Sequence, residues 1–367
     1  MRLLSLSLEQ YRNYGRLAVD FPSDDLHLFI GQNGSGKTNI LEAISLLSLT
    51  KSFLGLDEQD LRQWGTEFYR VTGKIRSDSG EEQELEVVSQ LTPRKLKGCL
   101  RNSVRIPIAE MVGLLPAVTF LPQDLSLFTG SPSERRRYFD QLLCQVSPGY
   151  FRSLMTYQRV LKQRNTLLRE LKNHAGDIDA LDPWDAQLAE HGSVLITLRR
   201  ELTETFNLTI ADEVRALGEL WERVSILYDT STDARDQGAI GDELHAALMQ
   251  NRQRDVLIQS TTVGPHRDDW TVIVDERPLI TFASRGQQRV VVLALLFLEA
   301  SYLELRRGEK PVILLDDIFS ELDENHRERL LKIFSGHQVF LTATELPGEG
   351  SFPGVVKEVS EGKLVTR

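Results

Sequence analysis

The residues with the most specific chemistry form a glycine-rich segment near the amino terminus. The segment GQNGSGKT matches the pattern G-x-x-x-x-G-K-[ST] in full. Its glycines let the backbone amides turn inward around an anion, and the helix expected after it adds a positive amino-terminal dipole. A chance glycine turn is the alternative, but the position between an apolar strand and an amphipathic helix favours a nucleotide phosphate. The predicted contact residues are Gly31, Gln32, Asn33, Gly34, Ser35, Gly36, Lys37 and Thr38.

Two carboxylates far downstream complete this chemistry. The apolar run Val312–Leu315 is followed by Asp316 and Asp317. With Thr38, Asp316 is predicted to hold Mg²⁺, while Lys37 contacts the β- and γ-phosphate oxygens and Asp317 acts as the general base on water. Because strands often end in Asp, the apolar run with its two acids indicates a nucleotide site only in combination with the glycine-rich segment. Many ABC-type ATPases have Glu at the second acid; because Asp is shorter, we expect hydrolysis no faster than about 1 s⁻¹.

A third segment precedes the apolar helix that starts at Val290. Its sequence, FASRGQQ from Phe282, is similar to the ABC signature, in which Ser and Gly at a helix amino terminus meet the γ-phosphate held by a partner subunit. An ordinary helix capped by Ser284 is the alternative. Beside the other two motifs, we favour a composite site in which Ser284, Gly286 and Gln287 bind the ATP of a second copy, so that ATP induces a homodimer.

Three shorter segments fit the same class. Gln123 lies where a Q-loop glutamine would sense Mg²⁺, assist hydrolysis and join the ATPase head to a helical lobe. The segment 320–323 falls where a D-loop would cross the dimer interface. Segment 342–345 reads TATE, without the histidine expected at the switch position, so another residue must sense the γ-phosphate.

The elements that must position these residues follow from hydrophobic patterning. They predict an α/β head of the P-loop ABC type, built from residues 1–130 and 262–367 (lobe I), and an inserted helical lobe at 131–261 (lobe II). No long coiled coil is expected, since the helical stripes are short. The expected elements are strand 26–30 and helix 38–49, hairpin strands 71–75 and 85–91, buried parallel strands 311–315 and 339–342, and long helices within 133–259 with a turn at Asp182-Pro183.

Composition narrows the class of protein. Of 367 residues, 41% are hydrophobic and 26% charged, as in ordinary globular proteins. Cys99 and Cys144 match no metal-ligand or redox spacing, which favours a reducing compartment. The longest apolar run, 290–298, is about half of the ~20 residues needed to span a bilayer, so we expect a core helix, no membrane and a cytoplasmic protein.

Six segments together resemble one family. They are 11–14 (YRNY), 31–43, 51–53, 120–125, 130–140 and 264–269 (GPHRDD), and all are similar to the RecF family in order and spacing. The resemblance implies an ABC/SMC-like ATPase that binds DNA as an ATP-induced dimer, hydrolyses ATP slowly and, with RecR and RecO, helps to load RecA at single-strand gaps. It also implies that Arg12 and Asn13 contact the nucleotide. The alternative is a nucleotide-binding subunit of another ABC-type assembly.

Any DNA contact must come from local basic clusters, because the net charge of −10 disfavours bulk attraction of DNA. Aromatic residues are not interleaved with these clusters, which favours backbone recognition of duplex DNA or of a single-strand/double-strand junction. Segment 266–269 (HRDD) could suggest a metal or nuclease site, but Pro265 favours a structured loop. The candidate clusters are 94–97 with Arg101 and Arg105; 135–137; Lys162, Arg164 and Arg169; and 199–200.

Overall fold

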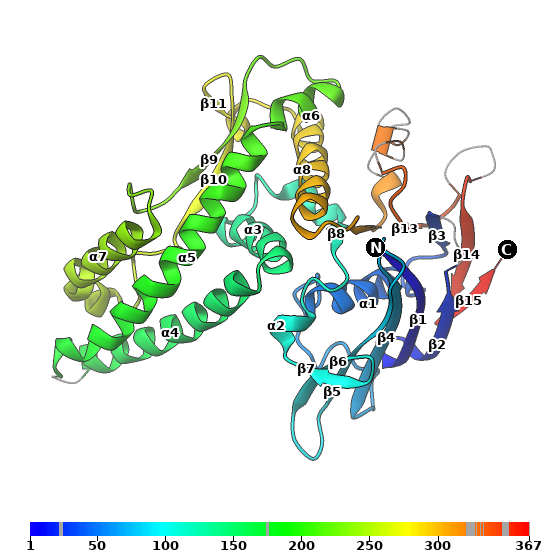
Figure 1. Cartoon of the computed structure of the whole chain (residues 1–367), viewed down its shortest axis with the longest axis horizontal. Helices are drawn as coiled ribbons and strands as arrows, with labels where there is room; N and C mark the ends of the chain where they lie inside the picture. The colour runs from blue at the N-terminus through cyan, green and yellow to red at the C-terminus, as the bar shows by residue number, and fades with distance from the viewer. Residues whose placement is uncertain are drawn as a thin grey trace. The chain divides into compact units, whose positions relative to one another are not determined.

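The structure, a computed structural model, divides into two compact units (Figure 1). Unit 1 comprises Met1–Leu125 and Leu295–Arg367, and unit 2 comprises Ser126–Ala294. The residues described are 1–21, 25–173, 176–320, 327, 329, 330, 332, 334–346 and 352–366. Within them, no helix is both long and apolar enough to cross a membrane.

Unit 1 contains a six-stranded sheet in the order β15-β14-β3-β13-β12-β8. All neighbouring strands are parallel except β14 and β15. The strand before the glycine-rich segment (β3) and the strand before the two acids (β12) therefore end at the same edge of the sheet. The predicted buried strands are confirmed, with every residue of β12 and β13 buried. The strands are β3 (Leu26–Ile30), β8 (Ala117–Phe120), β12 (Val312–Leu315), β13 (Val339–Ala343), β14 (Val355–Ser360) and β15 (Lys363–Thr366).

A second, antiparallel sheet has the order β2-β1-β4-β5-β6-β7. The predicted hairpin is confirmed, and its register pairs Arg76 with Glu82 beside the turn. The short elements that follow are α2 (Ile108–Met111) and the 3₁₀ turn η1 (Pro122–Ser126). The strands are β1 (Arg2–Tyr11), β2 (Tyr14–Asp20), β4 (Phe68–Arg76), β5 (Glu82–Gln90), β6 (Leu96–Arg101) and β7 (Val104–Ile106).

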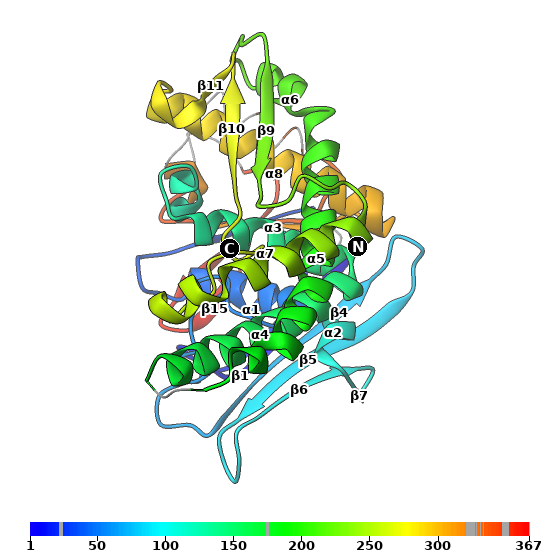
Figure 2. The same ribbon diagram turned by 90° about the vertical axis from the view of Figure 1, so that its left-hand side faces the viewer.

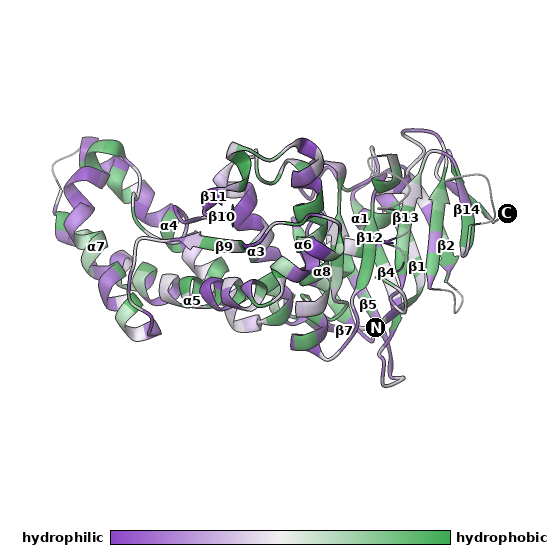
Figure 3. Cartoon of the chain, turned by 90° about the horizontal axis from the view of Figure 1, so that it is seen from above, coloured by the Kyte–Doolittle hydropathy of each residue, from purple (hydrophilic) through white to green (hydrophobic). Residues whose placement is uncertain are grey.

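Helix α1 (Lys37–Leu49) contacts both sheets of unit 1, and its apolar residues join one core with them. At Gly73 of β4, a Cβ would lie 2.4 Å from Leu47 Cδ1, so the sheet approaches the helix through a residue without a side chain. Figure 3 shows the apolar colouring of these strands. The core holds the start of α1, and with it the glycine-rich segment, in a fixed place.

Unit 2 consists of helices beside a three-stranded antiparallel sheet, β11-β10-β9 (Figure 2). Helix α5 contacts α4 and α7, and α3 contacts α4. Its elements are α3 (Pro132–Val146), α4 (Pro148–Asn173), η2 (Ile178–Leu181), α5 (Asp182–Asn207), α6 (Ile210–Ala216), β9 (Val224–Asp229), α7 (Gln237–Ile258), β10 (Asp269–Val274), β11 (Arg277–Pro278) and η3 (Leu279–Thr281), and α8 (Arg285–Arg307) begins in it.

Two predictions about this region differ from the structure. Unit 2 reaches Ala294 rather than 261, because β10 pairs along its whole length with β9 and also contacts β11 and η3, which lead into α8. The Asp182-Pro183 pair is not a turn but opens α5, where proline is tolerated because a first-turn amide has no helical partner. The predicted core helix at 290–298 is confirmed within α8.

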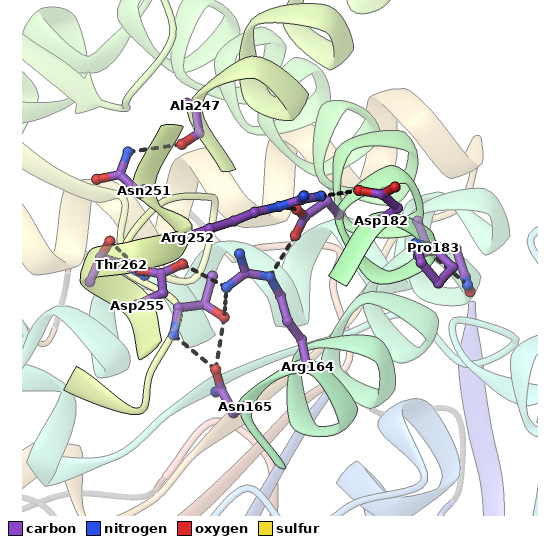
Figure 4. A network of polar contacts seen from close by, with 12 residues as sticks. Arg164, Asn165, Asp182, Pro183, Ala247, Asn251, Arg252, Asp255 and Thr262 are labelled. Atoms are coloured by element: carbon purple, nitrogen blue, oxygen red, sulfur yellow. Dashed lines mark hydrogen bonds and ion pairs between the residues drawn. The ribbon is translucent and has the colours of Figure 1, made fainter. Parts of the chain in front are cut away.

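The interior of unit 2 contains a network of charges (Figure 4). Arg164 of α4 is fully buried and donates to Asp185 of α5 and Asp255 of α7, each at 2.6 Å. Arg252 of α7 donates to the other oxygen of Asp185 at 2.8 Å. The three helices are therefore joined by paired charges as well as by apolar packing.

Candidate nucleotide site

The glycine-rich segment connects β3 to α1 as predicted. Gly36, the residue before the helix, has φ 113°, which only glycine adopts readily. A Cβ there would also lie 2.5 Å from Asn13 Nδ2 and 2.7 Å from the Tyr14 hydroxyl oxygen. The turn into α1 therefore requires glycine both for its backbone conformation and for its close neighbours.

Lys37 is held over the segment rather than in open solvent. Its Nζ donates to the carbonyl oxygens of Gly31 at 2.7 Å and Gln32 at 2.9 Å, and the residue is 7% exposed. Burial lowers the pKa of Lys37, while the charges of Asp317 and Asp316 oppose this shift. An ammonium group among backbone groups at the start of a helix suits an oxyanion of high charge.

Asp316 meets Thr38 across the core of unit 1. The Thr38 hydroxyl donates to both carboxylate oxygens at 2.9 and 3.0 Å, although 278 residues separate the two in sequence. Burial raises the pKa of Asp316, while hydrogen bonds from Thr342 and Thr38 oppose the rise. A nearby cation would favour the charged carboxylate. A hydroxyl and a carboxylate are among the donors with which proteins hold Mg²⁺, together with phosphate oxygens and water.

Thr342 has a role here that sequence reasoning missed. Its hydroxyl donates to Asp316 Oδ1 at 2.7 Å and accepts the Asp317 amide at 2.9 Å, and the residue is fully buried in β13. Asp317 has a left-handed backbone with φ 46°. Thr342 thus fixes the turn that presents both acids. In the sequence, Thr342 is a polar residue that follows the apolar run 339–341. This polar position within a buried strand is the signal that could have identified it.

The YRNY segment supports the glycine-rich segment from outside. Asn13 Nδ2 donates to the Ser35 carbonyl at 2.9 Å, and the Tyr14 hydroxyl donates to the Gly36 carbonyl at 3.0 Å. Arg12 Nε donates at 2.9 Å to Glu42, a fully buried carboxylate of α1. The structure therefore places Asn13 beside the glycine-rich segment and pairs Arg12 with helix α1.

Gln123 lies in η1, directly after β8, and is exposed. β8 neighbours β12 in parallel, with Phe120 in register with Leu315, and the Asp316 amide donates to the Phe120 carbonyl at 3.0 Å. Gln123 thus follows the strand beside the one that carries the acids. The predicted D-loop, 320–323, reaches beyond the described residues.

The signature-like segment lies in unit 2. The Ser284 hydroxyl accepts from the Gln287 amide at 3.3 Å, and the Ser284 amide donates to Gln287 Oε1 at 3.0 Å. Gln287 Nε2 also donates to Glu219 at 3.1 Å. Ser284 and Gly286 are exposed at the start of α8. This reciprocal cap is the geometry of the ordinary capped helix, and it leaves the helix end open to a ligand.

The GPHRDD segment is a structured loop, as Pro265 indicated. His266 Nδ1 lies 2.7 Å from the Tyr157 hydroxyl, and its Nε2 lies 3.0 Å from the Thr261 carbonyl oxygen. Asp268 accepts from Tyr228, and Asp269 pairs with Arg135. Both acids and the imidazole are engaged in contacts that hold unit 2 together.

His266 should make the stability of the protein depend on pH. Burial lowers its pKa from 6.5 to about 4. Between these values the unfolded chain binds more protons than the folded chain, so the free energy of unfolding falls as pH decreases. From pH 7.5 to pH 5, His266 alone should remove about 2 kcal/mol. Urea unfolding at both pH values should show a smaller decrease for His266→Gln; an unchanged decrease would contradict this. His245→Gln, at a half-exposed position of α7, is the control.

Several cations predicted to meet DNA are used inside unit 2 instead. Arg135 pairs with Asp269, Arg136 donates to the Asp268 carbonyl, and Arg200 donates to backbone carbonyls at 232 and 234. Arg199 is 2% exposed and pairs with Asp140, and Arg164 is fully buried. Burial removes Arg164 and Arg199 from any surface that DNA could reach, whereas DNA contact by the half-buried Arg135, Arg136 and Arg200 stays a prediction.

Comparison with known proteins agrees with this architecture. The RecF/RecN/SMC N terminal domain family matches residues 2–345. The DNA replication and repair protein RecF of Streptococcus agalactiae serotype V is 34% identical over 367 residues, covering 99% of this chain and 98% of that protein. Two solved structures of the recombination mediator protein RecF in the RecFOR pathway, RecF-ATPrS and RecF-ATP, are each 30% identical, with TM-scores of 0.92 and 0.90. They cover 100% of this chain, which covers 98% and 97% of theirs. The chain belongs to the RecF family.

Proposed function

We propose that this protein is an ATP-dependent DNA-binding switch that acts in the cytoplasm in the repair of single-strand gaps. The observation that carries the proposal is the meeting of Lys37, Thr38 and Asp316 at the start of α1. Lys37 would contact the β- and γ-phosphates, and Thr38 and Asp316 would hold Mg²⁺, which supplies charge neutralisation to the phosphates. The similarity of this chain to the solved structure of RecF-ATP supports ATP as the ligand.

Hydrolysis would be slow and would serve to release DNA. Asp317 follows Asp316 on a backbone turn fixed by Thr342, which suits a group that orients water. Gln123 would sense Mg²⁺ from η1, which follows the strand beside β12. Arg12 and Asn13 would contact the nucleotide or position the glycine-rich segment that contacts it. Arg12 is held by its ion pair with Glu42, and Asn13 donates to the Ser35 carbonyl.

ATP would act by joining two copies. The amino terminus of α8 presents Ser284 and Gly286 to solvent, and Gln287 lies beside them. Each copy would offer this end to the γ-phosphate held by the other, so that two ATP molecules lie between two chains. As a RecF family member, the dimer would bind DNA and act with RecR and RecO in loading RecA.

Sedimentation tests this proposal directly. The purified protein is measured without nucleotide, with ADP and with ATP, each with and without a gapped duplex. We expect a monomer that dimerises only with ATP and then carries DNA. Ser284→Arg should abolish the dimer and spare ATP binding, because it places a bulky cation at the helix end. Leu208→Arg, at an exposed position after α5, is the matched control.

Two outcomes would contradict the proposal. A chain that binds ATP but stays monomeric and ignores DNA would instead fit the nucleotide-binding subunit of another ABC-type assembly. A Ser284→Arg variant that dimerises like the parent would show that the start of α8 is not part of the ATP-dependent interface.

A further inference from the structure

Helix α4 carries a row of exposed cations that no intramolecular contact explains. Arg152, Arg159, Lys162 and Arg169 are all exposed, and none forms an ion pair within the described part of the chain. Their spacings of seven, three and seven residues place them on one face of a helix with 3.6 residues per turn. We define these four residues as the α4 basic stripe.

The opposite face of α4 is the buried one. Tyr150, Leu154, Tyr157, Val160 and Leu168 are buried there. The helix contacts α3, α5 and α7, and it runs beside α5 in Figures 1 and 2. The basic stripe therefore faces away from the interior of unit 2 as a consequence of how α4 packs.

The charge of this helix departs from that of the chain. The protein has 53 acidic and 43 basic residues, yet the sequence from Pro148 to Arg169 contains no Asp or Glu. The remaining cation of this stretch, Arg164, is neutralised by Asp185 and Asp255 in the interior. A solvated helix face in an acidic protein would ordinarily mix both signs. Glu170, which follows Arg169, is the one acid of α4, so the exposed cations of this helix outnumber its acids and suit a polyanion.

We infer that the α4 basic stripe binds the phosphate backbone of duplex DNA. This inference rests on the proposed DNA-binding function and identifies the surface that performs it. From Arg152 to Arg169 the stripe is about 26 Å long at 1.5 Å per residue. One strand of B-DNA carries roughly seven phosphates over that length. No fully exposed aromatic ring of α4 is available for base stacking, since Tyr150 and Tyr157 are buried and Phe151 is half-buried. The stripe therefore follows the backbone without reading sequence.

Salt dependence gives a quantitative test with the full-length protein and ATP. Arg159→Gln with Lys162→Gln should weaken binding to a blunt duplex at least about tenfold at 100 mM salt, and should reduce the slope of log K against log[salt] by about 1.8. The loss should be equal for two duplexes of unrelated sequence. Arg152→Gln with Arg169→Gln, at the ends of the stripe, should have the same effect, so the test does not depend on one variant folding.

Two matched variants separate this surface from net charge and from fold. Arg215→Gln with Arg235→Gln removes the same two charges at exposed positions outside α4, and should leave affinity and slope unchanged. Arg159→Lys with Lys162→Arg keeps the charges and should keep binding. All variants should bind ATP and unfold at the temperature of the parent protein.

The outcomes distinguish the surface from the function. If the parent protein binds duplex DNA with ATP while both stripe variants match the α6 and loop control, the stripe is overturned and the proposed function stands. If the parent protein binds no duplex with any nucleotide, the proposed function fails and the stripe fails with it.

Discussion

Replacing Asp316 by asparagine should lower Mg²⁺-dependent ATP hydrolysis at least about 100-fold, equivalent to roughly 3 kcal/mol in the activation free energy. Asp316 is the carboxylate that meets the Thr38 hydroxyl at 2.9 Å, and it is 8% exposed. Asparagine keeps the shape and one acceptor oxygen but removes the negative charge that a divalent cation requires. Nucleotide affinity should then cease to depend on Mg²⁺, as titration with a fluorescent ATP analogue with and without Mg²⁺ would show.

Asp317→Asn is the matched comparison for this prediction. Asp317 is the general-base candidate, so its replacement should abolish hydrolysis while Mg²⁺-dependent ATP binding remains. This variant should also hold the ATP-bound dimer longer, because release would require hydrolysis. Loss of the Mg²⁺ dependence in Asp317→Asn but not in Asp316→Asn would reverse the assigned roles of the two acids.

Replacing Arg164 by methionine should lower the free energy of unfolding of unit 2 by about 3–5 kcal/mol. Arg164, Asp185 and Asp255 are all fully buried, and the two ion-pair distances are 2.6 Å. Methionine fills much of the space, but Asp255 would be left without its cation in the interior and Asp185 with Arg252 alone. Chemical denaturation followed by near-ultraviolet circular dichroism, to which the buried Trp270 of the same unit contributes, measures the loss.

Arg159→Met controls for the chemical change itself. It makes the same substitution on the same helix at an exposed position and should change the unfolding free energy by less than about 0.5 kcal/mol. An Arg164→Met protein within about 1 kcal/mol of the parent would mean that the network in Figure 4 contributes little to stability. The charge-reducing combination of Arg164→Met with Asp255→Asn should recover part of the loss, because it removes one unpaired carboxylate.

Contiguous features of the sequence determined the local parts of this protein. The strand at 26–30, the helix after it and the hairpin between β4 and β5 follow from short hydrophobic patterns. The eight residues from Gly31 to Thr38 specify their own turn, because glycine spacing and the start of a helix are local properties. Family resemblance was also readable at this level, since it depends on several such segments in order.

The tertiary structure alone decided which distant residues share a site and which charges remain available. Thr342 meets both acids only because β13 lies between β3 and β12 in the sheet, an order that no single segment encodes. Arg164 and Lys162 are two residues apart and looked equivalent in sequence, yet one is fully buried and the other exposed. A 100° turn per residue places them on different faces of α4, and only the packing of α5 and α7 determines which face is buried.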